Sequence, residues 1–311
     1  MSISASVGSA TAAPAQVEAE KSRPAGRSGG HRLKEGLLAA AFLLPSTIIF
    51  VAFFFLPFFR LFGYGLHRNN AFGTNERYVG FSQYRQVLTG HEFTEGLANS
   101  GKYVLLTVPA GLILGTLLAV TANRKLRGIK FFQTVFSSTV ATSVAVASVI
   151  FYVLINPQVG VFQVDWLANP RLALFAVSLS SVWQNLGLSF VIVLAGLQAI
   201  PEEVLEAATL DGFGPVRRFF RVTLPLLSPV LMFLIVVLSV FAFQAFAQID
   251  ILTQGGPTAG DTETLVYKIF NMQGPGKIGA GSVLALGLFG VTFLVTLAQF
   301  LILDKRVHYG S

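Results

Sequence analysis

Side chains that could carry out covalent, redox or metal chemistry are sparse in this 311-residue chain. It contains no cysteine, which excludes disulfides, thiolate metal sites and cysteine nucleophiles. Its four histidines stand at positions 31, 67, 91 and 308, and no two have the spacing of a metal-binding pair. There is no GxxxxGK(S/T) phosphate-binding loop, since GPGK at 274–277 lacks both the spacing and the final hydroxyl residue. These absences predict a chain that is not an enzyme.

The composition is that of a membrane protein. Hydrophobic residues make up 53% of the chain and charged residues 12%, with a mean hydropathy of +0.66, whereas soluble domains carry about 25% charged residues. Six apolar runs contain no Asp, Glu, Lys, Arg or His, and each is long enough to cross a hydrocarbon core of about 30 Å. They are residues 37–59, 103–122, 131–155, 172–199, 230–249 and 282–303. We therefore expect an all-α membrane protein with six transmembrane helices.

The basic residues predict the orientation of these spans. The net charge of +7 would also fit a nucleic-acid partner, but lysine and arginine gather on the cytoplasmic side of membrane proteins. With the N-terminus inside, 14 of the 22 basic residues fall on the cytoplasmic side, four of them within 123–130. Both termini are predicted to be cytoplasmic.

The same topology predicts how the chain is organised. Residues 1–34 are expected to form a disordered cytoplasmic tail, and residues 35–100 the first transmembrane helix with an external loop. Residues 101–305 would form the core, with a cytoplasmic loop at 200–228, and residues 306–311 a short cytoplasmic tail.

The sequence shows no feature that would supply the energy for transport. Ion-coupled carriers usually keep ionisable groups within the bilayer, and the six apolar runs hold none. Sodium sites built from carbonyls and hydroxyls stay open as an alternative. Because no nucleotide site is present either, an energy source on another polypeptide is implied.

A charged stretch, EEVLEAATLDGFGPVRRFFRVTLPLLSP, follows the fourth run at residues 202–229. A helix is predicted to begin beside Pro201 and to end near Leu210, followed by a tight reversal at 211–215. A second short helix from Pro215 would stop at the prolines 225 and 229. Its apolar face is expected to pack toward the membrane domain and its arginines to face the cytosol. The apolar residues of this face are Val216, Phe219, Phe220, Thr223 and Leu224. Such a bend suits docking to a soluble partner; the alternative is a solvated connector without one.

The spacing within this stretch resembles the EAA loop of ATP-binding-cassette (ABC) importer permeases. EAA at 206–208 is followed after three residues by Gly212, and after nine more by VTLP at 222–225, with Val222 where the pattern has Ile. The resemblance implies a type I ABC-importer permease fold and a loop that couples to a separate ATPase subunit. ATP and Mg would be bound by that ATPase, and no cofactor by this chain. The coupling residues it implies are Glu206, Ala207, Ala208, Gly212, Val222, Leu224 and Pro225.

Shorter motifs resemble the carbohydrate-uptake permeases, and among them the first subunit of the maltose-permease type. They are FLLP at 42–45, YVGFSQY at 78–84, Asn99-Ser100 and LTQGGP at 252–257. The resemblance implies a bacterial inner-membrane location and a heterodimer with a companion permease subunit. It also implies two copies of a cytoplasmic ATPase subunit and an extracytoplasmic solute-binding protein.

Uncharged amides within the spans are the candidates for contact with a hydroxylated solute. Gln184 and Asn185 lie beside Trp183, and Gln244 and Gln248 are four residues apart, which predicts one helical face. The alternative is that these amides bond to neighbouring helices. Outside the spans, ETLVYKIF at 263–270 predicts a short helix on the membrane surface, with Leu265, Val266, Ile269 and Phe270 on its apolar face.

The solute class rests on resemblance alone. Residues 255–270, with the GPVRRFF stretch at 214–220, look most like permeases of glycerol-3-phosphate and glycerophosphodiester importers. Permeases for disaccharides such as trehalose or maltose are the main alternative, and an ion-coupled secondary transporter is the other. Since the apolar runs hold no cation, phosphate recognition would fall to the binding protein or the companion subunit.

Overall fold

The computed structural model describes residues 29–303 except 71, 74–75, 125, 162–164 and 259, and side chains from Gly36 onward. The tails predicted at 1–34 and 306–311 lie outside this part, apart from 29–34. The chain divides into two units, Met1–Leu56 and Pro57–Ser311. The first contains α1 (Gly29–Phe50), which runs through Pro45, and the π-helical turn η1 (Val51–Phe55). Its described apolar side chains are exposed, as in a helix that faces lipid or another subunit.

Four helices of the described chain are long and apolar enough to cross a membrane. They are Gly36–Gly65, α4 (His91–Ala122), α7 (Ala173–Gln198) and α14 (Ile278–Leu303). Two bent helix pairs supply up to two further spans, Ile129–Ala141 with Val144–Ile155 and Pro215–Leu226 with Ser228–Phe243. Six spans are reached when each bent pair is taken as one.

The third span is bent by 105°, so a single helix over 131–155 was the wrong expectation. Helix α5 (Ile129–Ser137) tightens into the 3₁₀ turn η2 (Ser138–Ala141), and the backbone is extended at the next two residues. Helix α6 (Val144–Ile155) then begins with Ser143 as its N-cap, whose hydroxyl accepts the N–H of Val146. Hydroxyl side chains that bond the local backbone compete with helix continuation, which explains the break.

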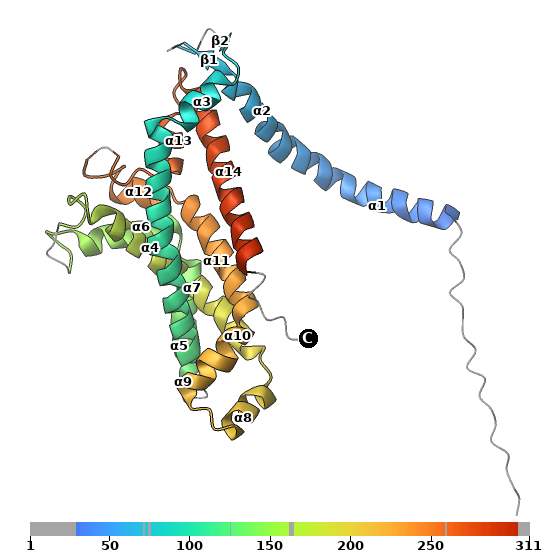
Figure 1. Cartoon of the computed structure of the whole chain (residues 1–311), viewed down its shortest axis with the longest axis vertical. Helices are drawn as coiled ribbons and strands as arrows, with labels where there is room; N and C mark the ends of the chain where they lie inside the picture. Colours follow the sequence, from blue (N-terminus) through green and yellow to red (C-terminus); the bar gives the residue numbers. More distant parts are fainter. Residues whose placement is uncertain are drawn as a thin grey trace, which may run out of the picture. The chain divides into compact units, whose positions relative to one another are not determined.

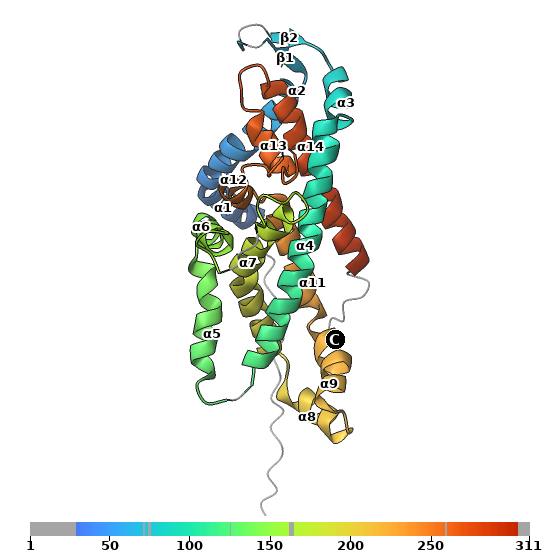
Figure 2. The ribbon, with the colours of Figure 1, turned by 90° about the vertical axis from the view of Figure 1, so that its left-hand side faces the viewer.

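The core of the second unit is built on the packing of α4 against α7 (Figure 2). Two glycines bring backbones together here, because a Cβ at Gly115 would overlap Ser189 and one at Gly187 would overlap Thr139. The N–H of Gly187 also donates to Thr139 Oγ1 at 2.9 Å. Small residues at such contacts are the usual means by which membrane helices approach closely.

Short elements gather at the end of this unit that carries α13 (Leu265–Asn271), as Figure 1 shows. Helix α2 (Leu56–Gly65) leads to the antiparallel strands β1 (His67–Asn69) and β2 (Glu76–Tyr78), which pair His67 with Tyr78. Helix α3 (Ser82–Leu88) precedes α4. The second span was expected to begin at residue 103, but α4 begins at His91, so this helix also carries Glu92, Glu95 and Lys102.

The fifth span ends earlier than expected. Helix α11 (Ser228–Phe243) stops at Gln244, and α12 (Ala247–Leu252) starts only after Phe246. The continuous helix expected over 230–249 is therefore wrong. At the opposite end of the unit from α13, α11 is preceded by helices α8 (Glu202–Leu210) and α9 (Pro215–Arg218), the turn η3 (Phe219–Thr223) and α10 (Leu224–Leu226) (Figures 1 and 2).

Candidate functional site

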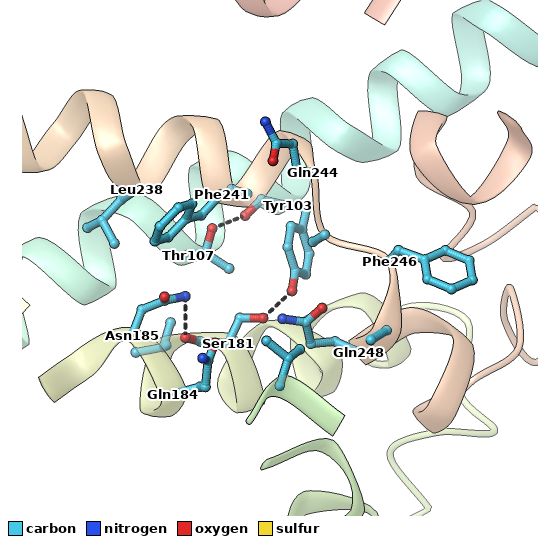
Figure 3. Close-up of a pocket in the computed structure, with 15 residues that line it drawn as sticks. Tyr103, Thr107, Ser181, Gln184, Asn185, Leu238, Phe241, Gln244, Phe246 and Gln248 are labelled. Atoms are coloured by element: carbon cyan, nitrogen blue, oxygen red, sulfur yellow. Dashed lines mark hydrogen bonds between the residues drawn. The ribbon is translucent and has the colours of Figure 1, made fainter. Parts of the chain in front are cut away.

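A cavity of about 450 Å³ lies where α4, α7 and the break after α11 meet. Its lining includes the four amide residues singled out from the sequence, together with aromatic and hydroxyl side chains (Figure 3). The polar members of this lining are Tyr103, Thr107, Ser181, Gln184, Asn185, Gln244 and Gln248. Among the described residues that line the cavity, none carries a charge. The cavity therefore offers hydroxyl and amide groups to a solute, and no ion.

Hydrogen bonds divide these polar residues into two groups. The hydroxyls of Tyr103 and Ser181 bond across the α4–α7 contact, and the Asn185 amide donates to the Ser181 carbonyl on its own helix. The Thr107 hydroxyl likewise donates to the Tyr103 carbonyl. Within the described part of the chain, the amides of the three glutamines make no hydrogen bond. Within the described residues, these three amides therefore do not link neighbouring helices.

Gln244 and Gln248 do not share a helical face, because the backbone break separates them. Gln244 is the exposed C-cap residue of α11, whereas Gln248 is buried in α12. In Figure 3 the Gln248 amide lies beside the hydrogen bond between Tyr103 and Ser181. Both glutamines still line the same cavity, and their contact with a solute stays a prediction.

Sequence reasoning missed the hydroxyl residues of α4 and α7. Tyr103 and Thr107 lie four residues apart and follow Asn99, so that a polar stripe runs along one face of α4. This periodicity was readable in the sequence. The stripe was not recognised as a cavity lining, because an isolated Tyr or Thr within an apolar run is usually a packing residue.

The charged stretch forms the expected pair of helices. Helix α8 ends at Leu210 as predicted, and Gly212 makes the reversal in the left-handed region with φ of +77°. Pro215 opens α9, and the following helical turns end at Leu226, among the prolines predicted to stop them. The structure places the motif residues as follows: Glu206, Ala207 and Gly212 are exposed, Ala208 is buried, and Val222, Leu224 and Pro225 are half-buried.

Apolar side chains of this α8–α9 hairpin (residues 202–218) are not covered within the described chain. A cleft of about 1,240 Å³ separates the hairpin and the η3 turn from the ends of α4 and α5. Val216 and Phe220 line it and are 71% and 60% exposed, so the expected packing of this face against the membrane domain is wrong for these two residues. Leu210 at the tip is 89% exposed. Exposed apolar groups that lie close together are typical of surfaces that contact another molecule.

The helix predicted at 263–270 is present as α13, but it does not lie free on a surface. It packs against α4 and α14 and buries Leu265, Tyr267 and Lys268, whereas Phe270 is exposed. The expected apolar face is therefore divided: Leu265 is buried, Val266 and Ile269 are half-buried, and Phe270 is exposed. A buried lysine was missed because two of its three partners lie on α4, far away in the sequence.

Residues 111–309 match the family of binding-protein-dependent transport system inner membrane components. This match spans more than half of the chain. The chain belongs to this family. The α8–α9 hairpin lies within the matched residues of the permease, and so do the cavity-lining residues other than Tyr103 and Thr107.

Curated relatives of the permease have similar lengths. The sn-glycerol-3-phosphate transport system permease protein UgpA of Agrobacterium fabrum is 34% identical over 286 residues, which cover 88% of this chain and 97% of the relative. The UgpA protein of Salmonella typhimurium is 34% identical over 276 residues, covering 85% and 93%.

Solved structures show that the permease has the fold of an ABC-importer permease. A bacterial ABC transporter involved in the import of the acidic polysaccharide alginate matches with a TM-score of 0.75 at 21% identity, covering 88% of this chain and 97% of the other. The bacterial alginate transporter in complex with an alginate pentasaccharide-bound periplasmic protein matches with 0.76 at 21% identity, covering 90% and 98%. The type I permease fold expected from the sequence is confirmed.

Proposed function

We propose that this permease forms half of the translocation path of an ABC importer and that its solute passes through the uncharged cavity. The observation that carries this proposal is the backbone break at 244–246, which lines the cavity. Non-helical backbone at membrane depth is tolerated where it is buried in protein or borders a water-filled space, and transporters use such breaks at their binding sites. The unbonded glutamine amides around the break then serve the hydroxyl groups of the solute.

The α8–α9 hairpin is the proposed contact with a separate ATPase subunit, which would bind ATP and Mg. Its exposed apolar tip and exposed Glu206 support this role, because a partner would cover them. The hairpin and both termini would then be cytoplasmic, and the α13 end would face outward. The further partners proposed are a companion permease, a second ATPase copy and an extracytoplasmic binding protein, in the inner membrane of a bacterial cell.

The proposed solute is sn-glycerol-3-phosphate or a glycerophosphodiester, as the names of the curated relatives favour. The cavity would hold the glycerol hydroxyls, since no cation lines it to bind a phosphate. Phosphate recognition would then belong to the binding protein or the companion subunit. A disaccharide such as trehalose or maltose is the second candidate, favoured by the combination of amides with the aromatic rings of Phe241 and Phe246.

Reconstitution in vesicles tests the transport proposal. We expect ATP-dependent solute uptake only when the chain is combined with the companion permease, the ATPase and the binding protein. Uptake driven by an ion gradient in vesicles that hold this chain alone would refute the proposal. Calorimetry of the cognate binding protein with sn-glycerol-3-phosphate, glycerophosphocholine and trehalose decides between the solute candidates.

Charge reversal on α8 tests the coupling role. Glu206→Lys should abolish uptake and ATPase association while the chain still inserts in the membrane. Glu203→Lys is the matched control, because it reverses an exposed charge on the same helix outside the motif. Normal uptake by the E206K importer would count against coupling through this helix.

A further inference from the structure

Lys268 is a buried cation outside the cavity, and the transport proposal does not use it. The residue is 3% exposed, yet it is ionised, because its Nζ lies 3.0 Å from Glu92 Oε2, 2.7 Å from Glu95 Oε2 and 3.1 Å from Glu263 Oε2. Burial alone would lower the pKa of Lys268, but the hydrogen bonds to these carboxylates raise it above its ordinary value. The ammonium therefore stays charged throughout the physiological pH range.

This cluster joins two parts of the chain that are far apart in sequence. Glu92 and Glu95 belong to the first turns of α4, whereas Glu263 and Lys268 belong to the segment 254–271, which we call the α13 segment. Three side chains would carry negative charge around one ammonium, so removal of the lysine would leave carboxylates that repel one another. Lys268 therefore offsets the charge of the three carboxylates at the contact between α4 and the α13 segment.

Other contacts continue from the cluster along the same face of α4. The Asn99 amide donates to the Gly260 carbonyl at 2.6 Å, and Ser100 Oγ accepts the N–H of Leu265 at 2.9 Å. At Gly96 the two parts approach closely, because a Cβ there would lie 3.1 Å from Lys268 Cδ. The next turn of this face carries Tyr103, which reaches the cavity.

The α13 segment is also bonded to the backbone break that borders the cavity. The Thr264 hydroxyl donates to the Ala245 carbonyl at 3.3 Å, and Thr264 lies one helical turn before Lys268. The Thr253 and Thr262 hydroxyls bond at 2.7 Å and close the loop that leaves α12. Gln248 lies between these two attachments, so the α13 segment fixes both ends of the stretch that brings Gln248 to the cavity.

We propose that Lys268 is a positioning residue for solute transfer: its ion pairs seat the α13 segment on α4 and thereby hold Gln248 in the cavity. The proposal that the cavity carries the solute underlies the transport part of this inference. The placement of Gln248 does not depend on it.

Thiol labelling tests the placement directly, because the native chain has no cysteine. In the assembled importer carrying Q248C, the introduced thiol should react slowly with a water-soluble methanethiosulfonate, since Gln248 is 7% exposed. Lys268→Met should raise the rate about tenfold, equivalent to about 1.4 kcal/mol in the opening equilibrium. Lys277→Met, at an exposed lysine near the same end, should leave the rate unchanged. A thiol at S189C, which is buried on α7 outside the cavity lining, should not respond to K268M.

A charge exchange separates positioning from a loss of folding. Combining Lys268→Glu with Glu95→Lys keeps one ammonium among three carboxylates, so the labelling rate should return toward that of the native lysine. An unchanged rate in K268M, an equal rise at S189C, or no rescue by the exchange would overturn the inference.

The transport consequence is measured as sn-glycerol-3-phosphate molecules imported per ATP hydrolysed. Loss of folded importer lowers uptake and hydrolysis together, whereas misplacement of Gln248 lowers their ratio. We expect Lys268→Met and Gln248→Ala to lower the ratio about equally, and the double variant to lower it no further. Multiplicative effects, or a ratio that falls only in Q248A, would overturn the role of Lys268. If Q248A leaves the ratio unchanged while labelling responds to K268M, the cavity proposal fails and the placement of Gln248 stands.

Discussion

The two ends of the second unit use charge in opposite ways. At the α13 end, Lys268 is 3% exposed and is held by three carboxylates of the same chain. At the other end, the α8–α9 hairpin keeps its acidic residues exposed, together with the apolar side chains of Leu210 and Val216. The α13 segment buries its lysine within the chain, whereas the hairpin exposes both carboxylates and apolar side chains.

Under the two proposals above, this difference separates positioning at one end from docking at the other. An ion cluster with satisfied partners fixes one geometry, since each charge is costly to bury alone. An exposed helix pair with apolar tips gains its contacts only when a partner arrives. Acidic residues thus fix the α13 segment at one end, and at the other end they form part of an exposed surface.

The largest effect is expected from a change that disrupts the exposed apolar surface of the α8–α9 hairpin and leaves the fold intact. Replacing Leu210 and Val216 together by Glu should lower ATPase affinity by about 30-fold or more, since the loss of even one central apolar anchor costs about 2 kcal/mol. The matched control replaces Val159 and Val161, two exposed valines outside the hairpin, by Glu. Quantitative pull-down of the ATPase and thermal unfolding of the chain are the measurements. If the double variant instead unfolds at a lower temperature and still binds the ATPase, Leu210 and Val216 stabilise the fold and do not form a docking surface.

A second change is made at the α13 end, where we expect the thermal stability of the chain to fall. Gly96→Leu places a side chain where Leu265 Cα lies 3.2 Å from the added Cβ, and overpacking of this kind costs about 1–3 kcal/mol. Gly101→Leu is the control on the same helix, because no atom lies within 4 Å of its Cβ. Thermal unfolding in detergent should distinguish them, with a lower midpoint for G96L alone. Equal midpoints would mean that α13 is not seated as closely as described.

The smallest expected effect concerns the turn between α8 and α9. Gly212 has φ of +77°, and its added Cβ would meet no atom within 4 Å, so a substitution acts through the backbone alone. Gly212→Val should cost about 1–2 kcal/mol in the turn, whereas Gly212→Asn should cost less because Asn tolerates this region. ATP-driven uptake should therefore fall about tenfold in G212V and little in G212N. Similar uptake in both variants would mean that the turn is free to rearrange.

The sequence predicted the parts of the fold that depend on local composition. Apolar runs of sufficient length predicted the spans, and the spacing from Glu206 to Pro225 predicted the hairpin and its reversal at Gly212. The break at 138–143 was not predicted, because the hydroxyl residues that end α5 and cap α6 also occur as packing residues in unbroken helices.

The candidate site was only half visible in the sequence. Amides stand out in an apolar run, and all four line the cavity. The partnership of Tyr103 with Ser181 depends on the crossing of α4 and α7, which one sequence does not specify. Lys268 was missed for the same reason, since its three carboxylates come together only when α13 lies on α4.

The close contact of α4 with α7 at Gly115 has a mechanical consequence. Because the two backbones are so close, sliding of one helix along the other would produce a collision at Ser189. We therefore expect α4 and α7 to move as one rigid body. Rotation during a transport cycle is then left to the interruptions of the other helices, at 142–143, at Leu227 and at 244–246. We expect these three joints, and not the helix pair, to change their dihedral angles when the path opens to the other side.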